Sequence, residues 1–181
     1  MIRSTIAALV FSFTTTAFAA CPPPADIADE ETRLFETAQQ AESHKEGQEI
    51  TRALWRLWAT APDEQSQALL DRGMSARSSY DFLGAIDAFD RLTKYCPDYA
   101  EGYNQRAFVN FLREDFGRAL IDLERALERN PRHVAALAGM ALTLMRLGKN
   151  DEAQQVLREA LKLNPWIPER GLLQREKGID L

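Results

Sequence analysis

Apolar side chains recur three and four residues apart along residues 66–163, the spacing that gathers them on one face of an α-helix. The segments "FLGAIDAFDRL", "FGRALIDLERAL" and "DEAQQVLREAL" show this pattern most clearly. Two of the helices must end before Pro131 and Pro165, because a residue that precedes proline is disfavoured in the α region. The pattern predicts six helices, over residues 66–79, 82–95, 100–113, 116–129, 134–147 and 150–163.

These helices repeat with a period of 34 residues, and no insertion or deletion breaks the frame. Small residues recur where two helices must approach closely, and large residues recur beside them to fill the gaps. The pattern therefore predicts a stack of similar helix pairs. The equivalent positions include Pro97, Pro131 and Pro165; Gly73, Ala107 and Ala141; Ala85, Ala119 and Ala153; and Phe89, Leu123 and Leu157.

The 34-residue frame, the Ala-x-x-x-Phe and Ala-x-x-x-Leu pairs and the closing prolines resemble the tetratricopeptide repeat (TPR) family. The resemblance implies an all-α fold, a right-handed TPR-like superhelical stack of antiparallel helix pairs. It covers three repeats, at residues 66–99, 100–133 and 134–165. The chain departs from the family pattern at Arg72 and Arg106, where an apolar residue is usual, so Arg106 should meet a nearby carboxylate. The whole layout is similar to small exported TPR proteins of Gram-negative bacteria.

The segments on either side of the repeats also have helical patterns. Residues 31–65 resemble a degenerate TPR-like helix pair, in which Trp55 and Trp58 fall close to the repeat frame. Residues 166–181 are expected to form a C-terminal capping helix and tail, since a stack of repeats leaves an open apolar end that must be covered.

Residues 1–19 are expected to be a secretory signal peptide. Arg3 gives a positive start, an apolar run follows, and Ala17-Phe18-Ala19 is a small-x-small cleavage signal. The run is too short to span a bilayer, and no later segment is long and apolar enough to do so. The mature chain is therefore expected in the periplasm, beginning with a proline-rich arm over residues 20–30.

Cys21 and Cys96 are the only two cysteines in the chain. In an oxidising compartment they are expected to form a disulfide. Two alternatives stay open: both thiols are free, or Cys21 carries a lipid, because "FAAC" at residues 18–21 faintly resembles a lipidation signal.

The sequence predicts no catalytic residues, no metal site and no cofactor. A nucleophilic Cys96 would need a base within hydrogen-bond reach, but His133 lies about one repeat layer away, roughly 10 Å. Cys21, His44, Cys96 and His133 lack the close spacing of zinc ligands. The formal net charge of −5, and the absence of any basic run, argue against nucleic-acid binding.

The resemblance implies that the first helix of each repeat lines a concave groove. Leu70 and Met74 occupy the positions where some TPR proteins carry the clamp that grips chaperone tails, so that clamp is not implied. The expected partner is a protein or peptide. The residues expected to bind it are Arg77, Glu101, Asn104, Gln105, Phe108, Phe111, Leu142, Met145 and Arg146.

The sequence thus predicts a non-enzymatic protein- or peptide-binding TPR adaptor or assembly factor of the periplasm. A membrane-anchored structural lipoprotein, attached through Cys21, is the alternative. An enzyme or redox protein that uses Cys96 is a more distant third. The identity of the partner and the oligomeric state do not follow from the sequence.

Overall fold

The structure, a computed structural model, describes residues 20–174. The expected signal peptide and the last part of the expected tail, residues 175–181, lie outside the described residues. The described chain forms eight α-helices and one 3-10 helix, with no strand. The helices are α1 (Ala28–Gln40), α2 (His44–Trp58), α3 (Glu64–Ser78), α4 (Phe82–Tyr95), α5 (Ala100–Leu112), α6 (Phe116–Arg129), α7 (Val134–Arg146) and α8 (Asn150–Leu163), followed by the 3-10 helix η1 (Pro168–Leu172).

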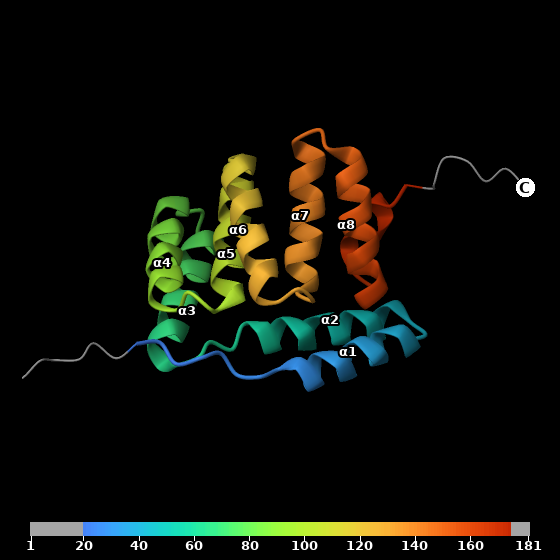
Figure 1. Cartoon of the computed structure of the whole chain (residues 1–181), viewed down its shortest axis with the longest axis horizontal. Coiled ribbons are helices and arrows are strands. Elements are labelled where there is room, and N and C mark those ends of the chain that lie inside the picture. Colours follow the sequence, from blue (N-terminus) through green and yellow to red (C-terminus); the bar gives the residue numbers. More distant parts are fainter. Residues whose placement is uncertain (1–19, 175–181) are drawn as a thin grey trace, which may run out of the picture.

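Helices α3 to α8 form three antiparallel pairs that stand side by side (Figure 1). Their bounds agree with the six predicted helices to within a few residues, and the all-α fold is confirmed. The close approach within a pair depends on the small residues of the frame. At Gly73, a Cβ atom would lie 2.3 Å from the Cε1 atom of Phe89 on the paired helix.

The turn inside each repeat contains one residue in the left-handed backbone conformation. These residues are Tyr80 (φ 62°), Glu114 (φ 61°) and Gly148 (φ 76°), which are again 34 residues apart. Glycine adopts this conformation without steric cost, whereas a side chain at the same position is strained. The turn geometry has therefore been kept in all three repeats, although only the third has the residue that favours it.

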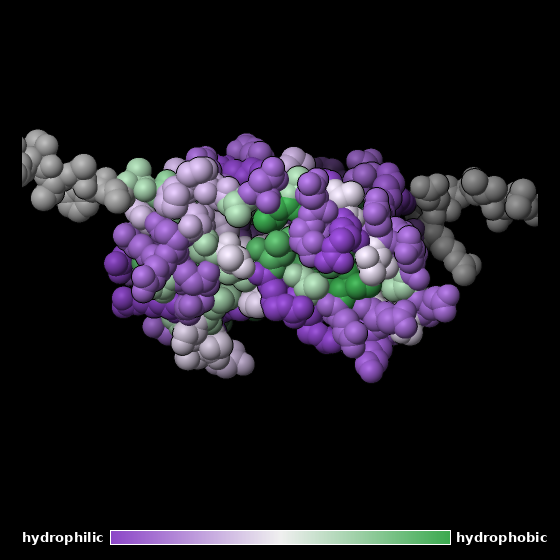
Figure 2. All heavy atoms as spheres, turned by 90° about the horizontal axis from the view of Figure 1, so that it is seen from below, coloured by the Kyte–Doolittle hydropathy of each residue, from purple (hydrophilic) through white to green (hydrophobic). Residues whose placement is uncertain are grey.

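Helices α1 and α2 form a hairpin that runs crosswise along one end of the stack (Figure 1). Seen from that side, the surface is mainly hydrophilic, with small hydrophobic patches between the polar side chains (Figure 2). The sequence interpretation of residues 31–65 is corrected here: they form a helix pair, but this pair is not a fourth layer of the stack. The physical reason is that its apolar side chains pack against α7 and α8 of the last repeat, while its polar groups and Trp58 contact the turns that join successive repeats.

The hairpin is held by equivalent residues of successive junction turns. The Asn130 side chain donates to Glu31 over 2.7 Å, and the Asn164 side chain donates to the hydroxyl of Thr51 over 2.9 Å. Tyr99 and His133, which occupy equivalent positions of two successive junction turns, both contact Trp58. The Tyr99 hydroxyl donates to the Trp58 carbonyl over 2.6 Å, and His133 stacks on the Trp58 ring.

An apolar core joins the hairpin to the last repeat. It contains Leu34 and Leu54 of the hairpin and Val134 and Ala138 of α7. The ring of Trp166 lies so close to α2 that a Cβ atom at residue 47, a glycine, would be 2.1 Å from the Cγ atom of Trp166. Trp166 also donates to the carbonyl of residue 38 over 2.8 Å. Burial of these side chains is the main stabilising contribution to the docked hairpin.

The segment after α8 covers part of its outer face. Gln154 of α8 donates to the carbonyl of Leu172 over 3.1 Å and accepts from the backbone of Gln174 over 2.8 Å. Where the sequence predicted a capping helix, the described residues form the short 3-10 helix η1. None of its residues is buried.

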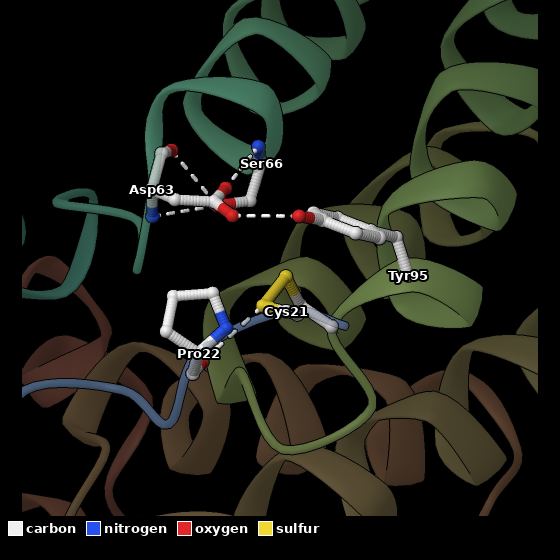
Figure 3. The surroundings of a disulfide bond; sticks show 6 residues. Cys21, Pro22, Asp63, Ser66 and Tyr95 are labelled. Carbon is white, nitrogen blue, oxygen red and sulfur yellow. Dashed lines mark hydrogen bonds between the residues drawn. A yellow bond between two sulfur atoms is a disulfide. The ribbon is translucent and has the colours of Figure 1, made fainter. Parts of the chain in front are cut away.

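A disulfide between Cys21 and Cys96 joins the N-terminal arm to the turn between the first two repeats, as predicted. Figure 3 shows that Asp63, Ser66 and Tyr95 lie beside it. Asp63 caps α3 by accepting from the backbone of Ser66 over 2.8 Å, and it also accepts from the Tyr95 hydroxyl over 2.7 Å. The hydrogen bonds from Ser66, followed by the one from Tyr95, hold the pKa of Asp63 below its usual value.

Candidate functional site

A cavity of about 300 Å³ lies between α2 and the first helices of the three repeats, α3, α5 and α7. We call it the groove cavity. Its walls are mainly apolar, and two large aromatic side chains there remain exposed: Trp55 at 41 % and Phe108 at 46 %. Such area is available for burial against a ligand. Its other apolar walls include Phe111, Ala135, Ala138, Gly139 and Leu142.

Trp55 is a wall of the cavity that the groove interpretation of the sequence did not include. The groove was assigned to the first helices of the repeats alone, whereas α2 lies across it. The signal in the sequence was a tryptophan next to Leu54, a core residue, because consecutive helix residues point about 100° apart and Trp55 therefore lies beside the buried face of α2.

Glu101 was predicted to face the open groove, and this prediction is wrong. Its side chain is 1 % exposed and accepts hydrogen bonds from three neighbours. Asn104 donates over 2.9 Å, His133 donates over 2.9 Å, and Gln105 also donates. A buried carboxylate needs such partners, because an unpaired charge in the interior is strongly unfavourable. Glu101 therefore does not face a ligand but fixes the positions of Asn104, Gln105 and His133.

Asn104 and Gln105 do line the cavity, but they are 8 % and 4 % exposed. Each amide group donates one N–H to Glu101, and this N–H is therefore not available to a ligand in the cavity. The Gln105 carbonyl oxygen accepts a hydrogen bond from Arg77. A continuous chain of polar contacts thus runs from Arg77 through Gln105 to Glu101 and His133.

His133 is the N-cap residue of α7 and links this polar chain to the hairpin. Its Nδ1 atom accepts from the backbone N–H of Ala136 over 3.3 Å, so the proton of the neutral ring sits on Nε2 and is donated to Glu101. The His133 side chain is 1 % exposed and stacks on the Trp58 ring.

Arg77 is the cation of the groove cavity. It extends from α3 and lies over the Phe108 ring, 4.9 Å from the centroid. Burial lowers the pKa of Arg77, and the charge of Glu101 opposes this shift.

The remaining predicted residues separate into two groups. Phe111 and Leu142 line the cavity, as expected. Met145 and Arg146 do not: Met145 packs against the core between the hairpin and α7, and Arg146 lies over the ring of Phe116 at the far end of the helix. The cavity is therefore closer to the junction turns than the sequence predicted.

Arg106 does find the carboxylate partners that its position required. It donates to Asp122 over 2.6 and 2.9 Å and to Asp90 over 2.7 Å. Burial alone would lower the pKa of Arg106, but the hydrogen bonds and charges of Asp122 and Asp90 outweigh it and raise the pKa. This network joins α4, α5 and α6 and has a structural role.

Neither a metal centre nor a membrane-spanning helix is found between residues 20 and 174. No three His, Cys, Asp or Glu side chains in this part of the chain gather as metal ligands would. No helix there is both long and apolar enough to cross a bilayer.

Comparison with known proteins explains the repeats. A sequence model described as "Tetratricopeptide repeat" matches residues 111–166. The repeats in this part of the chain are therefore tetratricopeptide repeats. A TPR repeat-containing protein of Rhizobium etli is 41 % identical over 68 residues, which are 38 % of this chain and 33 % of the relative. Human tetratricopeptide repeat protein 36 is 32 % identical over 116 residues, 61 % of this chain and 60 % of the relative. The matched part thus spans about a third to three fifths of these relatives.

Solved TPR structures share the fold at lower identity. The TPR2B domain of yeast Sti1, in complex with pHsp70, has a TM-score of 0.57 at 22 % identity and covers 61 % of this chain and 91 % of that chain. The first TPR of Spaghetti (RPAP3), bound to the HSP90 peptide SRMEEVD, has a TM-score of 0.59 at 21 % identity, with coverages of 60 % and 86 %. TPR proteins generally serve as non-enzymatic scaffolds for protein interactions, and this role fits the fold.

Proposed function

We propose that this TPR protein is an adaptor or assembly factor that binds a peptide segment of a partner protein in the groove cavity. The observation that carries the proposal is the pair of exposed aromatic side chains, Trp55 and Phe108, that face one cavity from two different helices. Aromatic side chains that become buried on binding are frequent anchors of protein interfaces. The peptide complexes of the Sti1 and Spaghetti TPR domains support the same kind of ligand.

We expect Phe108→Ala and Trp55→Ala each to weaken peptide binding at least tenfold, because truncation of an interface anchor removes more than about 1 kcal/mol. Peptides selected from a displayed library against the wild-type protein serve as ligands, with affinity measured by fluorescence polarisation. Leu83→Ala is the matched control, since Leu83 is 73 % exposed on α4 and does not line the cavity. Equal losses in Leu83→Ala and Phe108→Ala would count against the groove cavity as the binding site.

The proposed location is the periplasm. The Ala17-Phe18-Ala19 signal supports export, and the Cys21–Cys96 disulfide is typical of an oxidising compartment. The disulfide also uses the Cys21 sulfur atom that a lipid anchor would need, which favours an unanchored protein over the lipoprotein alternative.

We expect the mature protein to begin at Ala20 and to appear in the periplasmic fraction with the mass of an unmodified chain. Intact mass spectrometry of the isolated protein, before and after reduction, measures both points: reduction should add the mass of two hydrogen atoms. A chain that still starts at Met1, or one with the added mass of a lipid, would contradict the proposed location.

A further inference from the structure

Arg77 and Arg106 are both partly buried arginines of the repeats, but they differ in their counter-ions. Arg106 has two aspartate partners, whereas Arg77 forms no ion pair within residues 20–174. Its partner there is the neutral carbonyl oxygen of Gln105. The nearest acid in the same polar chain, Glu101, already accepts from Asn104, Gln105 and His133. The charge of Arg77 is therefore available to a ligand.

The surroundings make this free cation selective for a carboxylate. A guanidinium group has five N–H donors in a planar fork, and the Gln105 oxygen uses one of them. Charge-assisted bonds from arginine to a carboxylate are stronger than bonds to neutral acceptors, and frequently form in pairs. Partial burial strengthens the preference, since water competes less well there than at an open surface. The polar chain behind Arg77 holds the guanidinium in place.

The same residue lies against the apolar wall of the groove cavity. Its guanidinium covers the Phe108 ring, and Phe111 and Leu142 continue the wall. A ligand that reaches Arg77 must therefore place apolar atoms beside its carboxylate. The cavity also extends from α3 to Glu169 in η1, past all three repeats, which suits a chain that continues beyond the contact.

We propose that Arg77 binds the side-chain carboxylate of an aspartate or glutamate that neighbours a large apolar residue in an internal segment of the partner. The apolar residue occupies the groove cavity, and the acidic residue pairs with the arginine. This inference rests on the proposed function and adds the chemical class of the recognised segment. It makes Arg77 the residue that determines specificity, while Trp55 and Phe108 supply apolar area.

Two blocked dipeptides test the proposal: N-acetyl-Leu-Glu-amide and its neutral counterpart N-acetyl-Leu-Gln-amide. Dissociation constants are measured by titration of the full mature protein, followed through amide chemical shifts in NMR spectra. We expect the acidic probe to bind about tenfold more tightly, because hydrogen bonds to charged groups exceed those to neutral groups. Arg77→Gln should remove this difference. Arg72→Gln, an equal charge change at an exposed position of α3, should leave it intact.

Three results would overturn the inference. In the first, the acidic and neutral probes bind equally to the wild type. In the second, Arg72→Gln removes the preference for the acidic probe as fully as Arg77→Gln does. In the third, N-acetyl-leucine, with its terminal carboxylate, binds more tightly than the neutral probe while the Glu probe does not. The first result leaves the proposed function standing if both probes still lose affinity in Phe108→Ala. If Phe108→Ala binds both probes as tightly as the wild type does, the proposed function itself is contradicted. Thermal melting of Arg77→Gln shows whether the stack is still folded.

Discussion

Replacement of both Cys21 and Cys96 by serine is expected to lower the free energy of unfolding by about 4 kcal/mol at 25 °C. The disulfide joins positions 75 residues apart, and a cross-link over so long a loop greatly restricts the unfolded chain. A loss of this size is a large fraction of the total stability of a domain. Urea unfolding of the oxidised wild type and of the double variant measures the difference.

The wild type in the presence of a strong reductant is the control, and its stability should approach that of the double variant. Far-UV circular dichroism should stay close to the oxidised spectrum in both cases. The contacts of the hairpin with Asn130, His133 and Asn164 do not involve either cysteine, so we expect the hairpin to stay docked without the disulfide. Equal stability of the oxidised and reduced wild type would show that the bond does not restrict the unfolded chain as argued.

Glu101→Ala is expected to cost about 3–5 kcal/mol of stability, the range for removal of one partner from a buried charged network. The substitution leaves the donors of Asn104, Gln105 and His133 without their shared acceptor. It also removes the charge nearest to Arg77 on the polar chain. Thermal and urea unfolding measure the loss.

Glu124→Ala is a suitable control for this prediction, because Glu124 is exposed on α6 and a surface substitution usually changes stability by less than about 0.5 kcal/mol. Gln105→Ala should fall between the two, since it removes one of the three donors and leaves the carboxylate paired with the others. If Glu101→Ala were no more harmful than Glu124→Ala, the buried network would not stabilise the junction between the second and third repeats.

The repeats were predictable because their packing is local and periodic. Each pair of helices buries the same positions against its neighbour. The 34-residue pattern of small and large apolar residues therefore occurs three times and predicts the bounds of α3 to α8. Gly73 against Phe89 illustrates this: a single small residue and a single large one at fixed spacing define the contact. The disulfide was predictable for another reason, since a chain with two cysteines has only one possible intramolecular pairing.

The hairpin was not predictable from the repeat frame. Its contacts with Asn130, His133 and Asn164 join residues about 75 to 113 positions apart, and nothing in the period specifies what the junction turns contact. Trp55 and Trp58 fall close to the repeat frame, which favoured a degenerate TPR-like helix pair. The polar cluster at Glu101 was expected to face solvent because the residue that closes it, His133, lies 32 positions further along the chain, at the N-terminus of α7.

The docked hairpin also fixes how many repeats this chain can have. An ordinary solenoid can gain or lose a unit, since each unit touches only its neighbours. Here α2, with 15 residues and a length of about 22 Å, reaches from Tyr99 through His133 to Asn164. A duplicated unit would separate two of these contacts by a further 10 Å or so, one helix-packing distance. Insertion of a further unit between these junctions is therefore incompatible with the docked hairpin unless the hairpin lengthens with it.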